Sequence, residues 1–356
     1  MVRNGTMKAV VKVEPKPGIQ IGELSIPEIS PEEVLIRVKA VGICGSDVHI
    51  YEWTPAFEYL VKYMPVVLGH EFAGEVTEVG GLVSSVRVGD RVAYQGGSCG
   101  QCFYCNTAQH SLCDQRKAAG RIGLERKGGM AEYVVINARQ NFLPKIPARL
   151  SFEEAAQCQP TAEAFHILEK GDISVGDPVA VLGTGPIAVT VAQGAKLAGA
   201  SPVIVTGLSQ DTDRLSIAKS LGADYTIDVE KEDPVEKVKA VTGRMGAASV
   251  FEVSGSPKAL IQGLEMLRKG GTLVAFGLYP ENISVDITGR VVREMKVIRG
   301  VAGASRLAWS KVLGFMVSGQ IRVAPLITHR LPLERAEEGF RACLERKAMK
   351  VILLPS

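Results

Sequence analysis

The apolar positions of the chain follow two different patterns. Residues 7–95 contain short segments rich in β-branched residues, each broken by glycine or proline, which predicts an all-β region. Further along, the apolar positions form continuous runs at 179–183, 203–207, 249–255 and 271–277. Runs without polar alternation are typical of strands covered on both faces, as in a parallel sheet.

Three stretches between these runs have the apolar spacing of helices, namely 186–200, 212–223 and 257–269. The alternation of strand and helix from 178 to 277 therefore predicts a doubly wound α/β domain. The residues after 300 do not show this alternation of strand and helix patterns. Periodicity does not decide whether they extend that domain or return to the first.

Length and composition narrow the class of protein. The 356 residues suggest two domains at roughly 150 residues each. The hydrophobic share of 46% indicates a globular protein with a sizeable core. The formal net charge of +3 gives no reason to expect a nucleic-acid partner. No apolar run approaches the roughly 20 residues of a membrane span, and the first residues lack a signal-peptide pattern, so we expect a cytoplasmic protein without a membrane partner.

Seven cysteines occur in the chain, an odd number that argues against a disulfide framework and favours reduced thiols. Four of them form the pattern C-x2-C-x2-C-x7-C at Cys99, Cys102, Cys105 and Cys113. Four thiolates with short spacers favour a closed, structural zinc site. An iron–sulfur cluster also takes four thiolates, and buried thiols without a metal are the remaining alternative.

A second set of metal-binding residue types comprises Cys44, His70 and Glu71. Sulfur, imidazole and carboxylate together suit zinc, and three protein ligands leave one position open for a substrate. Zinc there would lower the pKa of an alcohol, and Ser46 and His49 are candidates for carrying the proton away. A lone buried cysteine, a surface histidine at 70 and a surface-loop imidazole at 49 are the alternative interpretations.

A dinucleotide fingerprint, G-x-G-x-x-A, follows the apolar run at 179–182 and opens a predicted helix. The first glycine would make the tight turn, and the second would let the backbone approach a pyrophosphate at the helix N-terminus. A structural turn without a ligand is the alternative. The predicted cofactor-binding residues here are Gly183, Thr184, Gly185, Pro186 and Ile187.

The next strand should end at the residue that contacts the adenosine ribose, where a carboxylate favours NAD. This chain has Gly207 at that position. The missing carboxylate favours NADP, with Ser209 or Arg214 as partners of the 2′-phosphate. Asp211 and Asp213 could still turn back to the ribose, so NAD stays open.

Taken together, these motifs resemble the zinc-containing medium-chain dehydrogenase/reductase family over essentially the whole chain. The resemblance rests on CGSD at 44–47, GHEFAGEVTEVG at 69–80, the four-cysteine lobe and the G-x-G-x-x-A turn. The segments at 47–53 and 327–340 resemble the L-threonine 3-dehydrogenase branch. The segment SFEEAAQCQP is similar in that branch and in the sorbitol (polyol) dehydrogenase branch.

The resemblance implies an α/β protein in which a Rossmann domain, a doubly wound parallel sheet, is inserted into a GroES-like, β-rich catalytic domain. The expected ranges are 1–157 and 300–356 for the catalytic domain, 95–115 for its structural-zinc lobe and 158–299 for the Rossmann domain. The C-terminal residues would thus return to the first domain. The family further implies a homo-tetramer, with a dimer as the alternative.

By position, Cys44, His70 and Glu71 match the family's catalytic-zinc segment. Ser46 matches the hydroxyl residue that passes on the substrate proton, and His49 matches a histidine near the substrate.

Ser254 and Gly277 match segments that line the nicotinamide. A departure from the family pattern is Gln159, because polyol and threonine dehydrogenases usually carry glutamate there, and an amide oxygen is a weaker fourth zinc ligand. Cys158 could take its place if the loop slipped by one residue.

We therefore expect two zinc ions per chain and the reversible oxidation of a secondary hydroxyl to a ketone with NAD or NADP. The substrate would be a small polar alcohol: a polyol, a sugar or a hydroxy-amino acid such as L-threonine. The alternatives are a dinucleotide-binding structural or regulatory protein without catalysis, and a zinc-independent reductase. Tyr51, Trp53 and Phe57 are candidates for the substrate pocket and could equally belong to the core.

Overall fold

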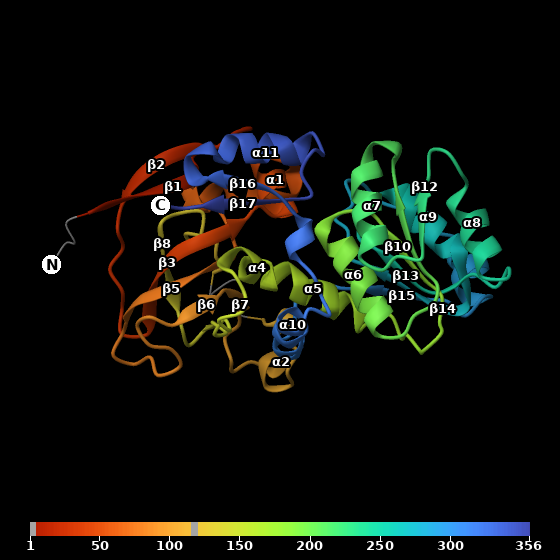
Figure 1. Cartoon of the computed structure of the whole chain (residues 1–356), viewed down its shortest axis with the longest axis horizontal. Coiled ribbons are helices and arrows are strands. Elements are labelled where there is room, and N and C mark those ends of the chain that lie inside the picture. Colours follow the sequence, from red (N-terminus) through yellow and green to blue (C-terminus); the bar gives the residue numbers. More distant parts are fainter. Residues whose placement is uncertain (1–4, 115–119) are drawn as a thin grey trace. The chain divides into compact units, whose positions relative to one another are not determined.

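The computed structural model describes residues 5–114 and 120–356, which form two compact units (Figure 1). The last residue of the expected structural-zinc lobe, Gln115, lies outside the described residues. The stretch Ser318–Arg322, which we expected in the catalytic domain, belongs to the second unit. The first unit is Met1–Gln159, Ala304–Val317 and Val323–Ser356, and the second is Pro160–Gly303 with Ser318–Arg322.

Antiparallel pairing dominates the first unit. One sheet has the order β2-β1-β4, a larger one has the order β16-β17-β3-β5-β6 with β8 also paired to β3, and β7 pairs with β9. The strands are β1 (Thr6–Lys12), β2 (Gln20–Ser25), β3 (Glu33–Gly42), β4 (Val66–Val67), β5 (Glu71–Val79), β6 (Arg91–Ala93), β7 (Gln95–Gly97), β8 (Tyr133–Asn137), β9 (Asn141–Phe142), β16 (Ile327–Pro332) and β17 (Lys350–Leu354).

The C-terminal strand returns to the larger sheet of the first unit, as the family resemblance implied. Ile352 of β17 pairs with Gly42 of β3, and Leu353 pairs with Val41 (Figure 1). Periodicity could not reveal this return, because the partner strand lies near the other end of the chain.

Helices also occur in the first unit, so the expectation of an all-β region over residues 7–95 is wrong at two places. The helix α1 (Gly45–Glu52) and a 3-10 helix (Pro55–Tyr63) interrupt the strands. The carboxylate of Asp47 accepts a hydrogen bond of 2.9 Å from the backbone N–H of Cys44 and so caps the start of α1. Two helical turns are too short to show a clear apolar period.

No helix within the described ranges combines the length and hydrophobicity that a membrane crossing requires. Further helices lie outside residues 179–300. They are α2 (Phe103–Asn106), α4 (Phe152–Ala156), α5 (Cys158–Leu168), α10 (Arg306–Ser318) and α11 (Ala336–Leu344), with 3-10 turns at His110–Leu112, Ala324–Leu326 and Leu333–Arg335.

The second unit is built on a six-stranded parallel sheet in the order β12-β11-β10-β13-β14-β15. This order is that of a doubly wound Rossmann sheet, which confirms the predicted fold. The strands are β10 (Val179–Leu182), β11 (Val203–Gly207), β12 (Tyr225–Asp228), β13 (Ala247–Glu252), β14 (Leu267–Ala275) and β15 (Val297–Gly300). The connections contain α6 (Pro186–Leu197), α7 (Thr212–Ser220), α8 (Pro234–Val241) and α9 (Pro257–Met266), a 3-10 turn at Ser209–Asp211 and a π-helical turn at Ile287–Val292.

Each unit has its own apolar core. The core of the first unit includes Val34, Ile36 and Val38 from β3, all fully buried. That of the second unit includes Ala180 of β10 and Val250 of β13. Because the strands of the second sheet are parallel, the carboxyl ends of β10, β11, β12, β13 and β14 lie along one edge, where ligands of such folds bind.

Candidate metal and cofactor sites

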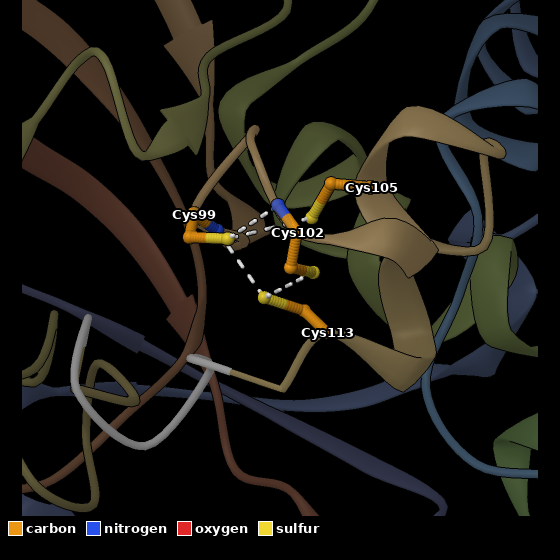
Figure 2. Close-up of side chains that lie close together, drawn as sticks. All are labelled: Cys99, Cys102, Cys105 and Cys113. Atoms are coloured by element: carbon orange, nitrogen blue, oxygen red, sulfur yellow. Dashed lines mark hydrogen bonds between the residues drawn. The ribbon is translucent and has the colours of Figure 1, made fainter.

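The four clustered cysteines point their sulfurs toward one another (Figure 2). Their sulfur atoms all lie within 4.8 Å of one another. Cys99 Sγ is 3.8 Å from Cys105 Sγ, and Cys102 Sγ is 3.9 Å from Cys113 Sγ. A zinc ion with four bonds of about 2.3 Å places its sulfurs about 3.8 Å apart. A disulfide would need about 2.05 Å, and these thiols are free. The lobe fits a single zinc ion.

Backbone amides around this lobe favour the thiolate form. The N–H of Cys102 donates to Cys99 Sγ at 3.4 Å, and the N–H of Cys99 donates to Cys113 Sγ at 3.3 Å. Hydrogen bonding from the backbone of Cys105 lowers the pKa of Cys102 to about 6. Thiolates are the form that binds a metal. The cysteines of an iron–sulfur cluster bind different iron atoms, so their sulfurs would lie farther apart than these.

The three residues of the predicted open site also come together. Cys44 follows β3, His70 precedes β5 and Glu71 begins it, and their ligand atoms lie within 4.8 Å of one another. Glu71 pairs with Gly42 across the two strands. A Cβ at Gly42 would lie 2.4 Å from Glu71 Oε2, so the glycine is what lets the carboxylate turn toward the group.

Asp47 is a site residue that sequence reasoning missed. It is fully buried on α1, and its Oδ1 lies 3.7 Å from Nδ1 of His70. Burial disfavours the charged imidazole, but Asp47 and the sulfur of Cys44 outweigh this effect and raise the pKa of His70 to about 10. The same negative groups would stabilise a metal cation. The available signal was the carboxylate one helical turn after Cys44.

Lys350 is the second residue that was missed. Its Nζ donates to Glu71 Oε2 at 2.6 Å and to the carbonyl of Ile43 at 3.1 Å, and both charged side chains are buried. A paired carboxylate is tolerated at such a position, whereas an isolated one is costly. No sequence signal identifies Lys350, because β17 brings it to this group from the far end of the chain.

The predicted relay residues lie on α1. Ser46 Oγ is 3.4 Å from Nε2 of His70, which places the hydroxyl at the open site. The ring of His49 stacks on Phe57, with the ring centroids 6.1 Å apart. Among the residues described, no hydrogen bond joins Ser46 to His49, so their relay stays a prediction.

All three aromatic pocket candidates take part in core packing, and Phe57 is itself a buried member of the core. Tyr51 stacks on Phe340 with centroids 5.1 Å apart, and its hydroxyl donates to Glu337 at 2.6 Å. Trp53 lies under the Lys12 ammonium, 5.4 Å from the ring centroid.

The predicted fourth ligand, Gln159, is the second residue of α5 and belongs to the same unit as Cys44. Its role stays a prediction. The alternative ligand, Cys158, is fully buried, with its sulfur 3.8 Å from that of Met316. Burial raises the pKa of Cys158 to about 12, which keeps it a thiol. The cluster around Cys44 does not include it.

The dinucleotide fingerprint lies where β10 ends and α6 begins. Gly183 has a positive φ of 125°, which favours glycine, and Gly185 is the N-cap of α6 with Pro186 as its first residue and Ile187 next. A Cβ at Gly183 would lie 3.2 Å from Cβ of Ser254, so the turn and the predicted nicotinamide segment are neighbours.

The predicted nicotinamide segment is hydrogen-bonded to a buried carboxylate, Glu252. This residue was not predicted from the sequence. It ends β13, is fully buried, and accepts hydrogen bonds from the N–H groups of Ser254 (2.8 Å) and Gly255 (3.1 Å). The hydroxyl of Tyr279 donates to it at 2.5 Å. A Cβ at Gly277 would lie 2.7 Å from Glu252 Oε2, so the predicted residues Ser254 and Gly277 flank one carboxylate.

At the carboxyl end of β11, the role of Ser209 and Arg214 as phosphate partners stays a prediction. Ser209 Oγ donates to both oxygens of Asp228, at 3.0 and 2.8 Å. The guanidinium of Arg214 lies 3.8 Å from the carboxylate of Asp211. Both predicted partners therefore already contact acidic groups beside Gly207.

Comparison with known proteins finds two matching family descriptions. Residues 30–148 match the alcohol dehydrogenase GroES-like domain, and residues 186–318 match the zinc-binding dehydrogenase family.

Several named dehydrogenases are similar over the full length. The L-threonine 3-dehydrogenase of Bacillus velezensis is 38% identical over 353 residues, which are 99% of each chain. The sorbitol dehydrogenase of Halalkalibacterium halodurans is 36% identical and covers 98% of this chain and 99% of its own. The crystal structure of 2R,3R-butanediol dehydrogenase from Bacillus subtilis superposes with a TM-score of 0.87 at 31% identity, covering 98% of this chain and 100% of its own.

Proposed function

Because the chain belongs to the zinc-containing medium-chain dehydrogenase/reductase family, we propose that it catalyses reversible hydride transfer between a secondary alcohol and NAD(P). The observation that carries this proposal is the grouping of Cys44, His70 and Glu71 in a chain that also holds a G-x-G-x-x-A turn at the start of α6. The relatives named above are dehydrogenases, which gives no support to the non-catalytic alternative.

In this proposal, Cys44, His70 and Glu71 hold the catalytic zinc, with Gln159 as the fourth ligand. A zinc ion bound there supplies a Lewis acid that lowers the pKa of a hydroxyl group. Asp47 faces Nδ1 of His70 and so leaves Nε2, the nitrogen on the Ser46 side, to the metal.

Ser46 would accept the substrate proton, and the position of its hydroxyl 3.4 Å from Nε2 of His70 supports this role. His49 lies three residues later on α1, one turn along the same helix face, and would pass the proton onward.

The four-cysteine lobe would hold a second, structural zinc ion, giving two per chain. The S···S distances near 3.8 Å and the lowered pKa of Cys102 support this count.

Small polar alcohols are the proposed substrates, because the similar enzymes are named for threonine, sorbitol and butanediol. A panel of L-threonine, sorbitol, xylitol, 2,3-butanediol and glucose, each with NAD+ and NADP+, tests this class. Reduction of neither cofactor with any of them would refute it. The homo-tetramer and the cytoplasmic location expected from the sequence stay predictions.

The decisive experiment compares three cysteine variants by metal analysis and turnover. Cys44→Ser should retain about one zinc per chain and lose turnover, because the open site loses its sulfur ligand. Cys102→Ser should lose the zinc of the lobe instead. Cys158→Ser, the matched control, should retain both ions. Full zinc content and full turnover in Cys44→Ser would refute the mechanism.

A further inference from the structure

The strand β11 has no room for the carboxylate that usually contacts the ribose. A Cβ at Gly207, its last residue, would lie 2.5 Å from Cγ2 of Thr184 and 3.2 Å from Cδ2 of Leu215. Thr184 lies inside the G-x-G-x-x-A turn. A side chain at position 207 would therefore require the Thr184 side chain to shift, so the packing around this residue disfavours an acid there.

The neighbouring strand brings a carboxylate to the same place. Asp228 is the last residue of β12 and pairs directly with Gly207. It accepts hydrogen bonds from the Ser209 hydroxyl at 3.0 and 2.8 Å, and Glu230 accepts one from the Ser209 N–H at 2.7 Å. Hydrogen bonds from Lys231 and Ser209 lower the pKa of Asp228 and keep it ionised at neutral pH.

Two cations near Ser209 contact carboxylates. Arg214 lies 3.8 Å from Asp211, and Lys231 lies 2.6 Å from Asp228. Glu230 adds a third carboxylate to these two ion pairs, so the five side chains named here sum to one negative charge.

A separate observation indicates that a ligand binds beside these residues. The side chain of Thr184 is 2% exposed, and its hydroxyl has no hydrogen-bond partner among the described residues. Its methyl group packs on Gly207. A buried hydroxyl without a partner is costly, and a cofactor oxygen would satisfy it.

We propose that Asp228, supported by Glu230, replaces the missing β11 carboxylate and makes the chain select NAD over NADP. The ribose 2′-hydroxyl of NAD can donate to the Asp228 carboxylate, as it does to an acid at the end of the preceding strand in other Rossmann folds. A 2′-phosphate would instead meet two carboxylates and find both donors of Ser209 engaged. This inference rests on the proposed dehydrogenase function and reverses the expectation that Ser209 and Arg214 bind a phosphate.

Direct binding to the full-length protein tests the proposal without turnover. NADH and NADPH are titrated separately and followed by nicotinamide fluorescence and by calorimetry. NADH should bind at least about tenfold more tightly than NADPH. In Asp228→Asn, which retains an oxygen acceptor for Ser209 but loses the charge, NADPH affinity should rise about tenfold.

Asp224→Asn is the matched control. Asp224 also pairs with a lysine, Lys196 at 2.7 Å, but it precedes β12 and lies at the opposite edge of the sheet. Its substitution should leave the ratio of the two affinities unchanged.

Ser209→Ala distinguishes selection of NAD by Asp228 from binding of the NADP 2′-phosphate by Ser209. If Asp228 sets the choice, this variant retains the preference for NADH. A selective loss of NADPH binding in Ser209→Ala, or equal affinities in the unmodified protein, would overturn the proposal while leaving the dehydrogenase function standing. If neither nucleotide bound, the proposed function itself would fail.

Discussion

Single side chains around the open metal site differ in how they influence it. Asp47 and Lys350 are both buried, but they contact different ligands. Asp47 faces Nδ1 of His70 at 3.7 Å, whereas Lys350 forms an ion pair with Glu71. Neither residue would touch the substrate oxygen through these contacts, so both act as positioning residues.

Replacing Asp47 tests this role. Asp47→Asn retains the size of the side chain but removes the charge that favours a cation at His70, so zinc affinity at the open site should fall about 10- to 100-fold. Competition with a chromophoric chelator measures the affinity. Glu52→Gln, an exposed change on the same helix, should have no effect. An unchanged zinc affinity in Asp47→Asn would show that His70 needs no orienting carboxylate.

Among the elements, α1 is held in part by a hydrogen bond from β1, a strand that precedes the metal ligands in the sequence. Lys12 of β1 is fully buried, and its Nζ donates to the carbonyls of Lys16, Gly18 and Tyr51. The bond to Tyr51 ties β1 to the last turn of the helix that carries Ser46 and His49. Trp53, just after the helix, has a φ of 60°, which is rare for a bulky residue and depends on its surroundings.

The burial of Lys12 predicts a pH dependence of stability. Burial lowers its pKa to about 8, whereas the unfolded chain has the ordinary 10.5. Between these values the unfolded state binds the extra proton, so the contribution of Lys12 to the free energy of unfolding should rise with pH. Urea unfolding at about pH 7 and about pH 10 should show this rise relative to Lys12→Met.

The control for this experiment is Lys16→Met, because that lysine is exposed. It should follow the pH profile of the unmodified protein. If Lys12→Met gave the same pH profile as the unmodified protein, the buried ammonium would not be the titrating group.

For the molecule as a whole, the two units should respond differently to loss of metal. Both candidate zinc groups belong to the first unit, and each unit has its own apolar core. Metal binding contributes to folding only where the ligands are. The Rossmann sheet should therefore retain its structure when zinc is removed.

Hydrogen exchange with and without a strong chelator measures this difference. Amides in residues 98–113 should lose protection, because the four thiolates repel one another without the ion. Amides of β10, β11 and β13 should remain protected. Cys102→Ser should reproduce the loss in the lobe without chelator. Equal loss of protection in both units would contradict independent stability.

The sequence correctly predicted those features whose residues lie close together along the chain. The cysteine spacing at 99–113 places four sulfurs in one loop, and the run 179–187 contains strand, turn and helix start together. The parallel sheet followed from apolar runs, because a strand covered on both faces has no polar positions. Cys44, His70 and Glu71 could be chosen because few residue types bind zinc.

Contacts between segments that are distant in the sequence could be identified only from the three-dimensional structure. Lys350 reaches Glu71 only through the pairing of β17 with β3, and Asp228 reaches Ser209 only because β12 lies beside β11. The charge at the ribose end shows the consequence most clearly. Gly207 alone predicts NADP, whereas the proposed preference for NAD rests on the carboxylate of the adjacent strand. The local sequence shows which side chains a segment contains. Strand pairing determines which charged side chains of other segments lie beside them.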